Sequence, residues 1–219
     1  MSKPRAMTAP PAPTLYADHA GRPFDPARPT LLMIHGVGND HSVWAAQAAA
    51  VAARGWNALA VDLPGHGRSG GTPPASVPQA AAALWHWLDT AIDPARALPR
   101  LALAGHSMGS LIALEMAAHA ARATPGGDAR VRELILVGTA SPMRVAPALL
   151  DAARQQPEAA MRMIEAFSRP KHAAPGSLPS DALLGPLMRR VQGASADVNR
   201  LAIGLQACDA YDGANAALA

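Results

Sequence analysis

The feature that most constrains this chain is a serine between two glycines, at residues 105–109 (Gly-His-Ser-Met-Gly), directly after the apolar run 101–104. Residues 110–123 then carry apolar side chains on one helical face, so the pattern predicts a strand, a sharp turn and a helix. The G-x-S-x-G nucleophile elbow requires that order. Small residues beside the serine give a strained turn the room it needs. We expect the turn to expose the Ser107 hydroxyl and to aim the first amides of the helix at an anion forming beside it.

Strand and helix patterns alternate on both sides of this turn. The predicted strands are 30–34, 57–61, 101–104 and 131–137, and the predicted helices between them are 42–54 and 76–90. The strands are continuous apolar runs, which is typical of strands buried on both faces. Alternation with helices predicts a mostly parallel sheet covered on both faces, an α/β fold of three layers. Residues 14–141 form this predicted core, and a short hairpin is expected within 14–24.

The chain changes character at residue 142. Four helical patterns follow without a strand pattern between them, at 147–156, 158–168, 183–191 and 197–211. We expect residues 142–219 to form a helical cap, or lid, over the strand ends. Residues 1–13 are rich in proline and alanine, which predicts a flexible leader.

Composition argues against several classes of protein. Half of the 219 residues are hydrophobic and 16% are charged, as in a globular domain. The net charge is +3 with scattered positive residues, so nucleic acid is not an expected partner. No apolar segment approaches the roughly 18 residues of a membrane span, no signal-peptide core is present, and the single cysteine, Cys208, fits a reducing compartment. These features predict a cytoplasmic protein without membrane contact, and the lack of a metal, phosphate-loop or cofactor motif predicts no cofactor.

Three motifs together resemble the α/β-hydrolase family, in particular its small cap-bearing esterase and lactonase-like members. They are His35-Gly36-Val37-Gly38 with Trp44, residues 62–69 (Asp-Leu-Pro-Gly-His-Gly-Arg-Ser), and residues 105–109. They follow the family's order and usual spacing and cover roughly residues 30–140. The resemblance implies that the strands and helices form the three-layer α/β-hydrolase fold with a cap.

The resemblance also implies a reaction and its residues. Ser107 would be the nucleophile, and the backbone amides of Val37 and Met108 would form the oxyanion hole. His35, Gly36 and His106 would lie in the loops beside the site. The implied activity is hydrolysis of a small-molecule carboxylic ester, lactone or thioester through a seryl acyl-enzyme.

Each marker also has a structural interpretation. His35 can fill space beside the turn, and Asp62, His66 and Ser69 can brace the loop that follows their strand. Residues 65–70 match the dinucleotide fingerprint G-x-G-x-x-G, but that fingerprint must open a helix and two prolines follow at 73–74 instead. Two other functions stay open: a different reaction at the same site (carbon–carbon hydrolysis, perhydrolysis or acyl transfer), or a non-catalytic homologue that keeps the pocket.

The base that should activate the serine is the missing part. In this fold the acid and the histidine follow the serine, on loops after further strands. After Ser107 the sequence has only His119 and His172. His119 lies about 18 Å along the predicted helix, and no strand places His172. We therefore expect the chain to be carboxyl-terminally incomplete. Whether these 219 residues alone turn over substrate stays open. The apolar strand 131–137 would then lie at an exposed sheet edge, where self-association is favoured.

Overall fold

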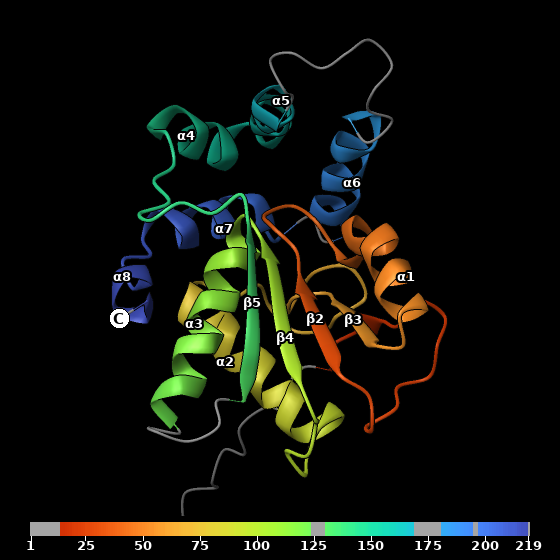
Figure 1. Cartoon of the computed structure of the whole chain (residues 1–219). Helices are drawn as coiled ribbons and strands as arrows, with labels where there is room; N and C mark the ends of the chain where they lie inside the picture. Colours follow the sequence, from red (N-terminus) through yellow and green to blue (C-terminus); the bar gives the residue numbers. More distant parts are fainter. Residues whose placement is uncertain (1–13, 124–129, 169–180, 195–196, 219) are drawn as a thin grey trace, which may run out of the picture.

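A computed structural model of the chain describes residues 14–123, 130–168, 181–194 and 197–218 (Figure 1). The leader predicted for residues 1–13 and the candidate base His172 lie outside the described residues. Within them, one sheet lies between helices, and further helices lie across the ends of the strands (Figure 1).

The sheet has five strands in the order β1-β3-β2-β4-β5. The strands are β1 (Ala17–Asp18), β2 (Thr30–Ile34), β3 (Asn57–Val61), β4 (Leu101–His106) and β5 (Val131–Val137). β2 to β5 are parallel, and only β1 runs antiparallel, beside β3. Ile34 lies opposite both Val61 and Gly105, so the carboxyl ends of the three central strands are level. The predicted mostly parallel sheet is confirmed.

The hairpin expected within residues 14–24 is wrong. A turn does form, since the Arg22 N–H donates to the His19 carbonyl at 3.1 Å, but no strand follows it. β1 pairs instead with β3, with Ala17 opposite Val61. This pairing occupies the outer edge of β3 and buries Leu15 and Ala17, which a two-stranded hairpin could not do.

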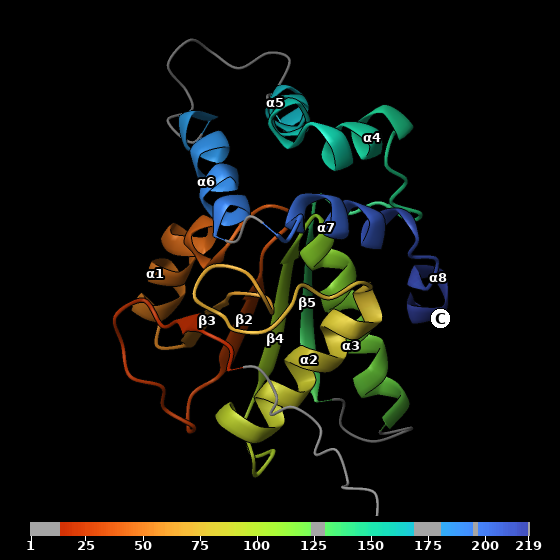
Figure 2. The ribbon, with the colours of Figure 1, turned by 180° about the vertical axis from the view of Figure 1, so that it is seen from behind.

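Helices cover both faces of the sheet. The helical elements are η1 (His41–Trp44), α1 (Ala45–Ala53), α2 (Val77–Trp87), η2 (Leu88–Ile92), α3 (Met108–Ala123), α4 (Pro147–Gln155), α5 (Pro157–Ser168), α6 (Asp181–Gly193), α7 (Arg200–Asp209) and α8 (Ala214–Leu218). Leu32 and Ile34 of β2 pack toward α2 and α3, whereas Leu31 and Met33 pack toward α1. Figure 2 shows α2 and α3 on their face of the sheet. The three predicted layers therefore follow from the period of two along each strand.

The helices predicted after residue 142 are confirmed as α4 to α7, and the described residues of this region contain no strand. Apolar side chains of these helices, including Met161, Met188 and Leu205, form a cluster of their own. The end of α7 and α8 instead join the main core, where Cys208 and Tyr211 are buried. Figure 1 shows α4 to α7 across the carboxyl ends of the strands.

β5 is an edge strand of the sheet formed by the described residues. Ile135 and Val137 are 47% and 43% exposed. Ile135 lies opposite Ala104, on the face of the sheet that packs against α1. Because α1 lies beside β2 and β3, it does not cover this face at β5 (Figure 1). None of the described helices has the length and apolar character that crossing a membrane would require.

Candidate functional site

The predicted strand–turn–helix around Ser107 is present. β4 ends at His106, α3 begins at Met108, and Ser107 between them has a φ angle of 53°. L-residues other than glycine rarely adopt this left-handed conformation. A side chain at Gly105 would clash with the Gly109 carbonyl, and one at Gly109 would clash with the Ile34 carbonyl. The glycines are therefore required by close backbone approach, as the sequence pattern indicates.

Backbone hydrogen bonds fix the strained serine in place. The Ser107 N–H donates to the Val137 carbonyl of β5 at 2.9 Å. The Ser107 carbonyl accepts from the N–H of Ser110 at 2.9 Å and from its hydroxyl at 2.6 Å. Both sides of the turn are thus held, one by the sheet and the other by the first turn of α3. A strained residue persists only when its surroundings determine it in this way.

The loop that follows β2 passes directly beside Ser107. A Cβ placed on Gly36 would lie 3.1 Å from the Ser107 Cβ, so this loop and the turn are in close contact. Among the hydrogen bonds of the described residues, none has the N–H of Val37 or of Met108 as its donor. The side chains of Val37 and Met108 both lie next to Gly204 of α7. The structure therefore brings Gly36, Val37, Ser107 and Met108 together.

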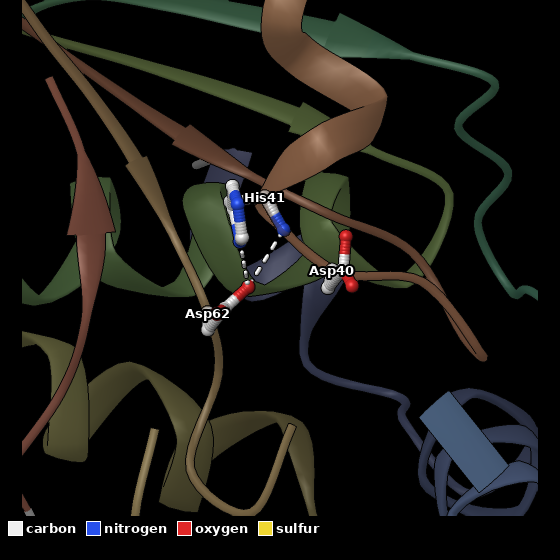
Figure 3. Close-up of side chains that lie close together, drawn as sticks. All are labelled: Asp40, His41 and Asp62. Carbon is white, nitrogen blue, oxygen red and sulfur yellow. Dashed lines mark hydrogen bonds and ion pairs between the residues drawn. The ribbon is translucent and has the colours of Figure 1, made fainter. Parts of the chain in front are cut away.

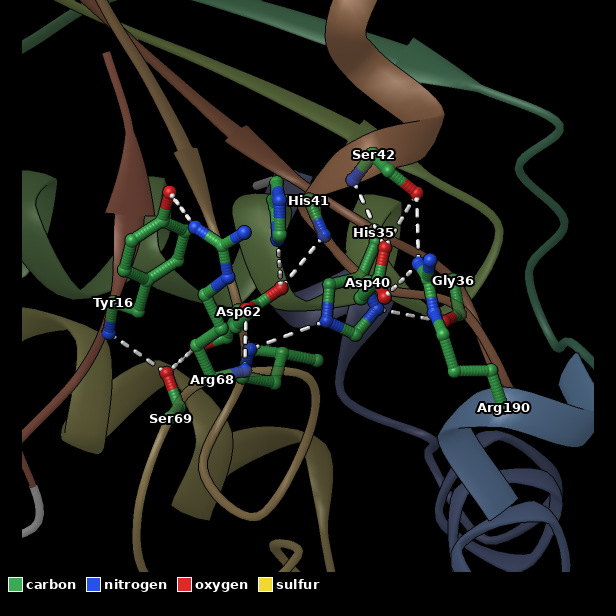
Figure 4. Close-up of polar contacts among 11 residues, drawn as sticks. Tyr16, His35, Gly36, Asp40, His41, Ser42, Asp62, Arg68, Ser69 and Arg190 are labelled. Atoms are coloured by element: carbon green, nitrogen blue, oxygen red, sulfur yellow. Dashed lines mark hydrogen bonds and ion pairs between the residues drawn. The ribbon is translucent and has the colours of Figure 1, made fainter. Parts of the chain in front are cut away.

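His35 braces this loop from behind (Figure 4). Its ring is fully buried; Nδ1–H donates to the Gly36 carbonyl at 2.9 Å, and Nε2 accepts from the Leu63 N–H at 3.1 Å. Burial, and to a lesser extent the neighbouring His66, lower the pKa of His35 to about 3. The imidazole is thus neutral with both nitrogens engaged. This arrangement matches the structural interpretation of His35.

No histidine in the described part of the chain is hydrogen-bonded to the Ser107 hydroxyl. His106 is half-buried between Gly36 and Gly138, and burial lowers its pKa. His119 lies farther along α3, where its ring is 6.4 Å from that of Trp85. The candidate site thus contains a serine and free amides without a histidine base from the described residues.

A cluster of Asp40, His41 and Asp62 lies at the carboxyl ends of β2 and β3, and the sequence analysis did not single it out (Figure 3). The backbone N–H and the Nδ1 of His41 both bond one Asp62 oxygen, at 2.7 and 2.9 Å, and the Arg68 N–H donates to the other at 2.8 Å. Asp40 caps η1 by accepting from the N–H and hydroxyl of Ser42. Ligand atoms of the cluster lie within 4.8 Å of one another, but protein donors already bond every carboxylate oxygen, which fits a brace rather than a metal site. An aspartate directly before a helix start was the signal that could have found Asp40.

The loop 62–69 is fastened at several points. The Ser69 hydroxyl donates to the Asp62 carbonyl at 2.6 Å and accepts from the Tyr16 N–H at 2.8 Å (Figure 4). Gly67 has a φ of 51°, and a side chain there would clash with the Asp62 carboxylate. The first helix after this loop begins at Val77, so the glycines of the loop do not open a helix as a dinucleotide site requires. The bracing role predicted for Asp62 and Ser69 agrees with these contacts.

Helices α6 and α7 are tied to both loops. The Arg190 guanidinium of α6 lies 2.5 Å from an Asp40 carboxylate oxygen (Figure 4), and the buried Arg200 of α7 donates to the Gly65 carbonyl at 2.5 Å. Burial raises the pKa of Asp40, but hydrogen bonds from Ser42 and Arg190 outweigh it and hold that pKa below its usual value. Met188 of α6 packs directly on Gly38. Helices from the second half of the chain therefore contact the loops after β2 and β3.

Comparison with known proteins agrees with this fold. A family model for the alpha/beta hydrolase fold matches residues 29–202. Similar solved structures include a hydrolase from Pseudomonas aeruginosa PA01 (19% identity, TM-score 0.64), covering 92% of this chain and 69% of that one. An esterase from Exiguobacterium antarcticum has 17% identity and TM-score 0.65, with 91% and 69% covered. The enol-lactonase from Burkholderia xenovorans LB400 has 21% identity and TM-score 0.59, with 91% and 70% covered. No curated protein matches the chain.

Proposed function

The chain belongs to the α/β-hydrolase fold family, and on that premise we propose that its site hydrolyses a carboxylic ester, lactone or thioester through a seryl acyl-enzyme on Ser107. The observation that carries the proposal is the strained Ser107 beside the loop that carries Val37, together with the backbone N–H groups of Val37 and Met108, which have no acceptor among the described residues. Acyl transfer builds negative charge on one oxygen, and fixed amides of this kind stabilise it.

The residues would act in a defined order. The Ser107 hydroxyl attacks the carbonyl carbon, its proton passes to a base, and the carbonyl oxygen becomes an oxyanion facing the amides of Val37 and Met108. Collapse of this intermediate breaks the bond to the alcohol or thiol, which leaves with a proton, and the acyl group stays on Ser107. Water then attacks the acyl-enzyme and releases the acid.

Proton transfer is the step that the described residues do not supply. His35 is neutral with both nitrogens engaged, and His41 is bonded to Asp62. The base would be His172, which lies outside the described residues, or an imidazole supplied from outside residues 1–219. A serine site without its base keeps some rate above that in water through its oxyanion hole and substrate binding. We therefore expect weak turnover if no base reaches Ser107.

Support for an apolar acyl substrate comes from the side chains around the amides. Val37 and Met108 face Gly204 of α7, and Met188 and Leu201 pack beside Gly38. We propose that residues 142–219 act as a cap whose helices α6 and α7 enclose the acyl group. Related esterase and lactonase structures share the fold, while substrate identity depends on these cap contacts.

The proposal is tested by covalent labelling of the intact chain with a fluorophosphonate, which reacts with activated serines. We expect the label on Ser107, found by mass spectrometry of peptides, and none in Ser107→Ala. Ser168→Ala is the matched control, because Ser168 is exposed at the end of α5 and, among the described residues, its hydroxyl donates to the Ile164 carbonyl. It should be labelled like the unmodified chain.

The outcomes separate the alternatives. Failure to label Ser107 in a sample that unfolds cooperatively would contradict the acyl-enzyme and favour a non-catalytic protein that keeps the pocket. If Ser107 is labelled, nitrophenyl esters and thioesters should be cleaved at a rate that Ser107→Ala loses. Product analysis with added peroxide or alcohol then distinguishes hydrolysis from perhydrolysis and acyl transfer.

A further inference from the structure

One polar atom beside the proposed site is buried without a partner. His66 is 3% exposed, its Nδ1–H donates to the Pro64 carbonyl at 2.9 Å, and its Nε2 has no hydrogen-bond partner among the described residues. A carbonyl can only accept, so Nδ1 carries the proton and Nε2 is a bare acceptor. Burial lowers the pKa of His66, which keeps the ring neutral. Leaving such an acceptor buried and unpaired costs free energy, so the atom calls for an explanation.

His66 lines a small cavity of about 10 Å³, and Met108, one of the two candidate oxyanion residues, lines it as well. Its neighbours in the wall include Met108 at the start of α3 and Ile203 and Gly204 of α7. Gly204 also lies beside Val37, so the cavity borders Met108 and is one residue away from Val37. In this arrangement it has room for about one hydroxyl group or one water molecule.

The lining favours a hydroxyl that is attached to a hydrocarbon chain. Apart from His66, the only polar side chain of the wall is Ser76, whose hydroxyl already accepts from the Gln79 N–H. A buried water molecule normally needs two to four polar partners, which this wall offers poorly. Only the hydroxyl fits this volume, so it would enter the cavity and use Nε2 as its acceptor, while the carbon chain that carries it stays outside, along Met108 and α7.

We propose that His66 Nε2 accepts a hydrogen bond from a hydroxyl on the acyl chain, so that the site selects hydroxylated aliphatic esters over plain ones. This inference rests on the proposed function, because it places the acyl group of that reaction between Met108 and α7. It assigns His66 as a specificity-determining residue that takes no part in bond breaking. A site built to bond a hydroxyl discriminates strongly against the analogue that lacks it.

Binding to the Ser107→Ala chain, in which turnover is absent, tests the proposal. The probes are methyl hexanoate and two hydroxylated forms, one with the hydroxyl on the third carbon and one with it at the chain end. We expect at least one hydroxylated ester to bind about tenfold more tightly than methyl hexanoate, as one added hydrogen bond allows. Its binding should also shift the ¹⁵N resonance of His66 Nε2, measured in the chain that keeps His66.

Two substitutions then test whether the His66 ring causes the preference for hydroxylated esters. His66→Phe keeps an aromatic ring without the acceptor and should bind the three esters equally. His86→Phe is the matched control, since His86 is exposed on α2, and it should keep the tenfold preference. If His66→Phe unfolds, the ¹⁵N shift decides alone, because it needs no change at residue 66.

Several results would overturn the inference. Equal affinity for the three esters, no binding of any of them, or a preference that leaves the His66 resonance unmoved would each do so. A Nε2 resonance that is hydrogen-bonded in the free protein and unchanged by every ester would identify a buried water as the donor. Labelling of Ser107 in the unmodified chain is measured separately. Labelling without hydroxyl preference refutes only the role of His66, and preference without labelling refutes only the acyl-enzyme.

Discussion

The guanidinium of Arg190 lies 2.5 Å from the carboxylate of Asp40, which connects α6 to the loop that carries Val37 across 150 residues of sequence. Asp40 is nearly buried and also caps η1, whereas the Arg190 side chain is 62% exposed. The pair therefore couples the position of α6 to the geometry of the loop beside Ser107.

We expect a double-mutant cycle of Asp40→Asn and Arg190→Gln to give a coupling of about 1 kcal/mol in the free energy of unfolding, because solvent screens the exposed arginine. The pKa of Asp40 is lowered in the folded state. Its contribution is therefore present above the ordinary value of 3.8 and is lost as the pH falls through the lower folded-state pKa. Urea unfolding at pH 7 and pH 3 measures both effects, and a difference between native and Asp40→Asn chains that is unchanged at pH 3 would contradict this account.

His35 should make the fold sensitive to mild acid. Its pKa is about 3 in the folded state against an ordinary 6.5, so the unfolded chain binds the proton first. Stability from this residue is complete above pH 6.5 and falls as the pH drops from there toward 3, by at most about 1.4 kcal/mol per pH unit. Urea unfolding between pH 7 and pH 4 should show this slope. His35→Gln should unfold at a lower urea concentration, yet its unfolding free energy should change less with pH. An equally steep change with pH would show that other groups cause the acid sensitivity.

Because Ser107 is strained, replacing it with glycine should stabilise the fold while removing the reactive hydroxyl. At a φ of 53° a glycine avoids the side-chain penalty that serine and alanine share. Ser107→Gly should therefore unfold with a free energy about 1 kcal/mol higher than Ser107→Ala, and both should lose fluorophosphonate labelling. Thermal unfolding of the two variants checks this. Equal stability would mean that the backbone relaxes out of the left-handed region.

Gly204 sets how closely α7 approaches the two amides. A methyl group there would lie 3.1 Å from both Val37 Cγ atoms and 3.4 Å from Met108 Sδ. We expect Gly204→Val to displace α7 and to change the labelling rate of Ser107 severalfold. Gly193→Ala is the control, since a Cβ there meets nothing within 4 Å. An unchanged rate in Gly204→Val would show that α7 does not limit access to Ser107.

The exposed edge of β5 is expected to drive self-association. β5 ends the sheet of the described residues, so its outer side, with the exposed Ile135 and Val137, can form a template for another strand. Ile135→Lys should lower the association seen by analytical ultracentrifugation. Phe167→Ser removes another exposed apolar side chain, at 76% exposure, away from this strand. An equal effect of the two substitutions would show that exposed hydrophobic surface in general, rather than the β5 edge, drives association. A purely monomeric unmodified protein would contradict the prediction.

Much of the fold could be predicted because its causes are local. The period of two along β2 separates Leu32 and Ile34 from Leu31 and Met33, which is enough to indicate a sheet covered on both faces. The glycines around Ser107 were also readable, since the tight turn itself leaves no room for a Cβ. The pairing of β1 with β3 was missed, because a short strand can pair with any open edge of a sheet and its own residues do not determine which edge that is.

The sequence by itself thus determined the order of strands and helices, the strained serine between its glycines, and the family motifs that surround them. Only the tertiary structure decided that Arg190 reaches Asp40, that Gly204 closes on Val37, and that His66 keeps a bare nitrogen beside Met108. The physical reason is the range of the interactions. Backbone sterics and apolar periodicity act between near neighbours in the chain, whereas side chains far apart in sequence meet only where the packing of whole elements brings them together.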